Sequence, residues 1–176
     1  MDEDKPKVTR GIRRGKFRLL LIVAALVVAL DQLSKLWVRA NSPQIELLPG
    51  FLDLVLVRND GAIFGLLSSQ TELLIALGIV GLLLILGFLH YFPPATTLGT
   101  LSFALILGGQ VGNLVDRIHL GHVIDFIRIY VQELFSWPAF NIADAAITVG
   151  IVTLIYSFHK SGVFTKVYEQ NHRPQD

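Results

Sequence analysis

Four apolar stretches, each close to the length needed to cross a membrane, dominate this sequence of 176 residues. A helix needs roughly 20 largely apolar residues to cross about 30 Å of hydrocarbon. Charged residues make up 16% of the chain, whereas a water-soluble domain carries about 25%. The sequence therefore predicts a mainly α-helical, polytopic membrane protein with transmembrane helices at about residues 19–38, 73–92, 98–115 and 142–158.

The first of these stretches allows two interpretations. Its purely apolar run, residues 19–30, is short and follows a basic segment, as in a secretory signal peptide. Continuing the helix past Asp31 instead restores a full span that ends at Trp37, a residue type enriched at membrane interfaces. We favour the continuous helix, in which Asp31 and Lys35 lie one turn apart in the order that favours an ion pair.

The distribution of Lys and Arg predicts how the chain is oriented. Seven of these residues lie in a basic N-terminal arm, residues 1–18, and three lie in a C-terminal tail, residues 160–176. Because basic segments remain on the cytoplasmic side, both tails should be cytoplasmic, which requires an even number of spans. Residues 19–159 then form one membrane domain, and the loops 39–72 and 116–141 face outward.

The two predicted outer loops differ from ordinary connectors. Residues 43–65 are rich in β-branched and large apolar side chains between Pro-Gly and Asn-Asp-Gly turn signals. This pattern predicts a small β-sheet or hairpin on the outer surface of the membrane. Aromatic residues in the second loop, residues 123–140, suit the level of the lipid headgroups.

Composition excludes several classes of function. The net charge is only +1 and no nucleic-acid-binding motif is present, so nucleic acid is not an expected partner. Without cysteine, the chain has no disulfide, no thiolate metal site and no cysteine nucleophile. Any catalysis must use Asp, Glu, His, Ser, Lys or Tyr.

Ionisable residues in or beside membrane spans are costly and are therefore functional candidates. The candidates are Asp31, Lys35, Asp116, Arg117, Asp125 and Asp144. For Asp31 with Lys35 we favour a structural interpretation, an ion pair that positions a helix or anchors it at the lipid boundary. For Asp116 and Arg117 the structural interpretation is a solvated end of a span.

Asp125 and Asp144 differ from the other candidates. One follows the third span and the other lies one turn into the fourth, so the intervening loop can bring both carboxylates to the same membrane depth. Asn141 is a good N-cap three residues before Asp144, and the helix N-terminus favours an ionised Asp144. Two adjacent carboxyl groups share one proton because both cannot ionise cheaply. The pair is typical of an aspartic protease.

Two other constellations are weaker. Asp116, His119 and His122 recur every three residues and could ligate a metal, but the pattern lacks the spacing of known helical zinc motifs. Ser34 beside Lys35 resembles a serine–lysine nucleophile pair, but adjacent helical residues point in different directions. We therefore expect no metal site and no cofactor.

Polar and small residues of the third span have a structural interpretation. Gly108 and Gly112 form a GxxxG pattern, which permits close packing of helices. Gln110 and Asn113 are expected to form hydrogen bonds with neighbouring helices or to support the site.

Taken together, five sequence blocks resemble the lipoprotein signal peptidases, also called signal peptidase II, a family of intramembrane aspartic proteases of bacterial plasma membranes. The blocks are Asp31-Gln32-Leu33-Ser34-Lys35, Asn59-Asp60-Gly61-Ala62-Ile63-Phe64, residues 108–117, Gly121-His122-Val123-Ile124-Asp125-Phe126 and Phe140-Asn141-Ile142-Ala143-Asp144.

The resemblance implies that Asp125 and Asp144 are the catalytic pair. It implies that seven other residues shape or support the site: Asp31, Lys35, Asn59, Gly61, Asn113, Arg117 and Asn141. The implied substrate is a prolipoprotein that is cut just before a diacylglyceryl-modified cysteine, with membrane lipids as further partners. We expect a monomer in the bacterial inner membrane, with the active site near the outer face.

A small transporter or proton channel is the rival interpretation, since it too would place acids in spans. It predicts polar residues along the whole membrane path. In this sequence the second and fourth spans are apolar over most of their length, and the acids gather at one boundary.

Overall fold

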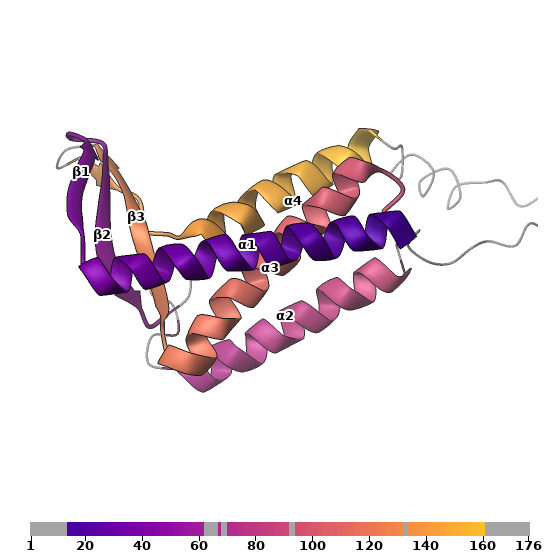
Figure 1. Ribbon diagram of the computed structural model, residues 1–176, viewed down its shortest axis with the longest axis horizontal. Helices are drawn as coiled ribbons and strands as arrows, with labels where there is room; N and C mark the ends of the chain where they lie inside the picture. The colour runs from indigo at the N-terminus through magenta and orange to yellow at the C-terminus, as the bar shows by residue number, and fades with distance from the viewer. Residues whose placement is uncertain (1–13, 62–66, 68–69, 92–93, 132–133, 161–176) are drawn as a thin grey trace, which may run out of the picture.

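Four long helices form the body of the protein. The computed structural model describes residues 14–61, 67, 70–91, 94–131 and 134–160. The helices are α1 (Arg14–Asn41), α2 (Thr71–Tyr91), α3 (Thr97–Leu120) and α4 (Ile142–Lys160). Each is long and apolar enough to cross a membrane, and they run the length of one bundle (Figure 1). The helix α1 continues unbroken past Asp31, as the favoured interpretation of the first span requires.

The central helix of the bundle is α3. Over the most apolar 18-residue window, 56% of α3 is buried, against 11% of α2. Small residues allow this close packing: a Cβ atom added at Gly108 would lie 2.7 Å from Cβ of Val27 on α1. One added at Gly112 would lie 2.6 Å from Oδ2 of Asp31. The predicted packing role of this glycine pair is confirmed.

A four-stranded antiparallel sheet covers one end of the bundle (Figure 1). Its order is β1 (Gln44–Leu48), β2 (Leu52–Asn59), β3 (Val123–Val131) and β4 (Phe135–Ser136). The sheet predicted for residues 43–65 is present as β1 and β2, although residues 62–65 lie outside the described part. The strand β3 was not predicted. It pairs with β2 and so unites the two loops in one sheet.

The side chains of β3 alternate between two environments. Ile124 and Phe126 form a hydrophobic core with Val38 of α1. Asp125, between them, points to the other face and forms a hydrogen bond with Asn59 of β2. Because a shift of one residue would exchange these faces, packing against α1 fixes which face Asp125 occupies.

The helices extend beyond the predicted spans. The helix α3 ends at Leu120 and not at the predicted residue 115. Gly121 caps this end: it adopts φ 79° and donates its backbone N–H to the Arg117 carbonyl. Asp116 and Arg117 therefore lie in the last turns of α3 and not in a loop. Apolar length predicts the part that can face lipid, whereas polar residues continue a helix wherever protein surrounds them. Most residues of the two predicted tails, 1–13 and 161–176, lie outside the described residues.

Candidate active site

Asp125 and Asp144 are held by the same residue. Asn141 donates its side-chain Nδ2–H to Oδ1 of Asp125 at 2.7 Å. Its backbone N–H donates to Oδ2 of Asp144 at 3.1 Å. A carboxylate on β3 and one in the first turn of α4 thus meet on either side of Asn141, as the spacing in the sequence predicted. We call Asp125 and Asp144, which Asn141 joins, the amide-bridged pair.

A second amide holds each of the two acids. Asn59 on β2 donates to Oδ2 of Asp125 at 2.8 Å, and Asn113 on α3 donates to Oδ1 of Asp144 at 2.7 Å. Each carboxyl group is therefore held in place by two hydrogen bonds from neutral donors. Neutral donors fix the orientation of a carboxyl group without cancelling its charge, so the pair can still exchange a proton.

Start-of-helix geometry explains the position of Asp144. Asn141 Oδ1 accepts a hydrogen bond from the backbone N–H of Asp144 at 2.9 Å, while Asp144 accepts from the backbone N–H of Asn141. This reciprocal arrangement is a capping box. The predicted N-cap role of Asn141 is confirmed, and the cap also delivers the amide that reaches Asp125.

The two acids differ in their access to solvent. Asp125 is 1% exposed, whereas Asp144 is partly exposed. Burial, with a smaller contribution from the charge of Asp144, raises the pKa of Asp125 from 3.8 to about 7, although the hydrogen bonds from Asn59 and Asn141 lower it. At neutral pH Asp125 therefore retains a substantial protonated fraction, while Asp144 is the more accessible acid.

A second group of charged residues is buried between α1 and α3. Lys35 is 2% exposed, and its Nζ lies 2.8 Å from Oδ2 of Asp31 and 3.0 Å from Oδ2 of Asp116. We call Asp31, Lys35 and Asp116 the lysine-bridged cluster. The predicted Asp31–Lys35 ion pair is present, but both partners are buried in protein, so the pair is no lipid anchor.

The lysine-bridged cluster is connected to Asp144 by hydrogen bonds. Lys35 donates to Oδ1 of Asn113 at 3.1 Å, and Asn113 donates to Asp144. Asp31 Oδ1 accepts the backbone N–H of Ala143 at 3.0 Å, in the first turn of α4. The cluster thereby locates both Asn113 and the start of the helix that carries Asp144.

The prediction of a solvated Asp116 is wrong. Asp116 is 3% exposed, and besides Lys35 it accepts hydrogen bonds from Gln32 at 3.0 Å and from the backbone N–H of Ile124 at 3.0 Å. It therefore joins α1 and α3 to the start of β3, one residue before Asp125. Sequence reasoning left Asp116 out of the site, although its place beside Arg117 in a family-like block was a signal.

Arg117 and Gly61 complete the surroundings of the two acids. Arg117 Nη2 donates to the carbonyl of Gly61 at 3.2 Å, and the Gly61 N–H donates to Oδ1 of Asn59 at 3.0 Å. The positive charge of Arg117 interacts with Asp144 and Asp125. Its Nε is buried and has no hydrogen-bond partner among the described residues.

The histidines of the weaker metal hypothesis lie apart from this network. The ring of His119 is 3.0 Å from the carbonyl of Val115, and His122 lines a separate cavity. Within the described part of the chain, no three His, Asp or Glu side chains gather in a way that could hold a metal ion.

Comparison with known proteins agrees with the resemblance in the sequence. Residues 23–160 match the family model described as signal peptidase (SPase) II. A lipoprotein signal peptidase of Syntrophotalea carbinolica is 39% identical over 158 residues, covering 86% of this chain and 98% of that protein. One of Moorella thermoacetica is 42% identical over 139 residues, covering 77% and 89%. A solved bacterial membrane enzyme with 28% identity superposes with a TM-score of 0.69, covering 85% of this chain and 96% of that one.

Proposed function

The chain belongs to the signal peptidase II family, and from that premise we propose that it is an aspartic endopeptidase that removes signal peptides from prolipoproteins. The proposed cut lies just before a diacylglyceryl-modified cysteine. The observation that carries the catalytic assignment is the hydrogen bonding of both Asp125 and Asp144 to Asn141. A transporter or channel is not favoured, because the family is one of peptidases.

In the proposed reaction the two acids take different roles. Asp144, the more exposed of the two, accepts a proton from a water molecule as that water attacks the scissile carbonyl carbon. Asp125 donates its proton to the carbonyl oxygen, forming a neutral tetrahedral intermediate. Collapse of the intermediate breaks the C–N bond as the proton held by Asp144 passes to the leaving amine. One hydroxyl of the intermediate returns its proton to Asp125, which leaves a carboxylic acid product and restores both acids to their starting states. The raised pKa of Asp125 supports this division of roles.

The remaining predicted site residues act on the acids as positioning residues in this proposal. Asn59, Asn113 and Asn141 orient the carboxyl groups through the hydrogen bonds already described. Lys35, neutralised by Asp31 and Asp116, orients Asn113. Arg117 holds the Gly61 carbonyl and so the turn after β2.

The position of the acids suits a substrate anchored in lipid. Asp125 belongs to β3 and Asp144 to the first turn of α4, and the sheet lies at the end of the bundle where α4 begins (Figure 1). We place this end at the outer face of the bacterial inner membrane and both termini in the cytoplasm, as the basic residues of the tails predict. The diacylglyceryl group would then remain in the bilayer and set the depth of the scissile bond.

The test uses the purified full chain and two forms of one prolipoprotein, with and without the diacylglyceryl group. We expect cleavage of the modified form alone, and no cleavage by Asp125→Asn or Asp144→Asn. The control is Asp53→Asn, which alters a buried acid of the same sheet that pairs with Arg128 outside the site. Turnover by either site variant above about a tenth of the unmodified enzyme would contradict the two-acid mechanism, since general acid–base groups contribute about 10²–10⁴-fold.

A further inference from the structure

A cavity of about 550 Å³ lies on the opposite face of β3 from the catalytic acids. Ile124 lines it, whereas the next residue, Asp125, faces the active site. Arg58 lines it in the same way, whereas the next residue of β2, Asn59, binds Asp125. The cavity therefore lies back to back with the active site, separated from it by two strands.

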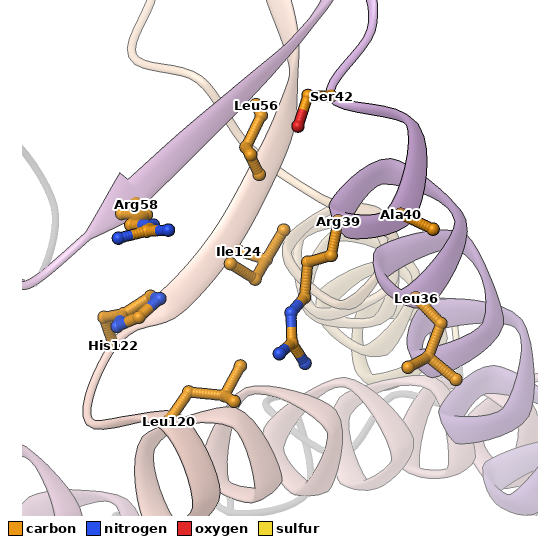
Figure 2. A pocket seen from close by; sticks show the side chains of 9 residues that line it. All are labelled: Leu36, Arg39, Ala40, Ser42, Leu56, Arg58, Leu120, His122 and Ile124. Carbon is orange, nitrogen blue, oxygen red and sulfur yellow. The ribbon is translucent and has the colours of Figure 1, made fainter.

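Three basic side chains from different parts of the chain converge on this cavity. Arg39 comes from the last turn of α1, Arg58 from β2 and His122 from the turn before β3. Figure 2 shows Arg58 and His122 on one side of the space and Arg39 on the other. Of the described residues that line the cavity, none is acidic.

The charges of these arginines are not compensated within the described structure. Neither the Arg39 nor the Arg58 side chain makes an ion pair or a hydrogen bond with a described residue. Arg128 on the neighbouring strand provides the contrast, because it pairs with Asp53. Two unpaired guanidinium groups facing one space favour an anion, and their planar donors suit the oxygens of a phosphate group.

Most of the remaining cavity wall is apolar, with Ser42 as the one further polar residue among the described residues that line it. Leu36, Leu56, Leu120 and Ile124 line it beside the basic groups. Leu36 is 55% exposed on α1. A second cavity of about 260 Å³ shares Leu36, Arg39 and Leu120 with the first and continues along α1 and α3, where its lining is mixed: Val115 beside the polar residues Gln32, Lys35, Asp116 and His119. A free inorganic anion would gain nothing from the apolar side chains Leu36, Leu56, Leu120 and Ile124, whereas an acyl chain would.

We propose that the basic cavity binds an anionic glycerophospholipid. Arg39 and Arg58 contact its phosphate group, His122 contributes a further polar contact, and an acyl chain lies over Leu36 and Leu120. Basic pockets between membrane helices bind anionic headgroups through their positive charge. The site is independent of the proposed peptidase activity, because none of the described residues that line it belongs to the amide-bridged pair.

The experiment measures lipid retained by the purified full chain in neutral detergent, using native mass spectrometry. Phosphatidylglycerol, phosphatidylcholine and inorganic phosphate are titrated separately. We expect one phosphatidylglycerol to bind, phosphatidylcholine to bind about tenfold more weakly, and millimolar phosphate neither to bind nor to displace the lipid. In Arg39→Gln/Arg58→Gln, affinity for phosphatidylglycerol should fall about tenfold, since each basic group near the lipid contributes several-fold.

Three controls keep the result interpretable. Arg39→Lys/Arg58→Lys retains the charge but not the planar pair of donors, so its affinity should lie between those of the unmodified protein and Arg39→Gln/Arg58→Gln. Arg14→Gln/Arg18→Gln removes the same charge from exposed positions at the other end of α1 and should leave the affinity unchanged. Asp125→Asn should bind the lipid normally, which separates this proposal from the proteolytic one.

Equal retention of phosphatidylglycerol by Arg39→Gln/Arg58→Gln would overturn the proposal. So would equal binding of phosphatidylcholine, which would indicate no preference for anionic lipid. Displacement of the lipid by millimolar phosphate would also overturn it, because the site would then recognise a free anion.

Discussion

The protein contains two pairs of neighbouring carboxyl groups, and a different kind of group bridges each pair. In the lysine-bridged cluster, Asp31 and Asp116 lie 2.8 Å and 3.0 Å from the same ammonium group of Lys35. In the amide-bridged pair, Asp125 and Asp144 bind the neutral residue Asn141 instead. The first pair has a charged group bonded between its acids, whereas the second is bridged by an uncharged amide and feels the charge of Arg117 only through space.

This difference separates a structural role from a chemical one. An acid that is buried beside an ammonium group has a partner for its charge and holds its neighbours in place. An acid held by amides keeps its orientation while its proton remains exchangeable, and burial raises the pKa of Asp125 to about 7. Asn113 joins the two groups, since it accepts from Lys35 and donates to Asp144. The lysine-bridged cluster thus supplies the rigidity on which the chemistry depends.

The largest expected effect breaks the amide-bridged pair. Asp125→Asn and Asp144→Asn should each lower kcat/KM by about 10³-fold, because an amide neither donates nor accepts the catalytic proton. Stability should not fall, since each change removes repulsion between two acids. Cleavage assays and chemical unfolding in detergent measure the two quantities. A variant that loses activity only because it unfolds would assign these acids to the structural class.

Breaking the lysine-bridged cluster should instead lower the stability of the protein. Lys35→Met leaves Asp31 and Asp116 buried without a counter-charge, so unfolding free energy should fall by about 3–5 kcal/mol. The matched control is the triple variant Asp31→Asn/Lys35→Met/Asp116→Asn, which carries no buried charge at these positions and should regain most of the lost stability. A loss below about 1 kcal/mol in Lys35→Met would remove the distinction between the two groups.

A smaller perturbation tests how tightly the cluster is packed. Gly112→Ala would place Cβ 2.6 Å from Oδ2 of Asp31, so Asp31 must shift, and a loss of about 1–3 kcal/mol is expected. Gly87→Ala on α2 is the control, because nothing lies within 4 Å of its added Cβ. Unfolding midpoints compare the two. Equal effects would mean that the space beside Asp31 is not limiting.

The smallest expected effect concerns the pH dependence of the amide-bridged pair. With the pKa of Asp125 at about 7, loss of its proton should lower kcat/KM about fivefold between pH 7 and pH 8. The folded state binds this proton more tightly than the unfolded state, whose pKa is about 3.9. The stabilisation is therefore complete below the unfolded pKa and is lost as pH rises toward 7.

Unfolding at several pH values checks the second part of that prediction. Asp125→Asn should flatten the decline in stability between about pH 4 and pH 7, because its amide does not titrate. Asp53→Asn, outside the site, should leave the decline in place. If stability still declined with pH in Asp125→Asn, a group other than Asp125 would cause the decline.

The amino-acid sequence by itself determined the features that depend on nearby residues. Apolar length predicted four membrane helices, and the i,i+4 spacing predicted the ion pair between Asp31 and Lys35. A capping rule predicted Asn141 as the start of α4. Each prediction succeeded because the interaction joins residues within one helix or one turn, where backbone geometry alone sets the distance.

Only the tertiary structure decided which distant residues meet. The strand β3 pairs with β2, which puts Asn59 against Asp125 across 66 positions of sequence. Asp116 is buried against Lys35 because small residues such as Gly108 let α3 approach α1 closely. No local sequence pattern predicts these contacts, because they depend on how helices and strands pack together. That packing turned an acid expected at a solvated helix end into part of the buried support of the site.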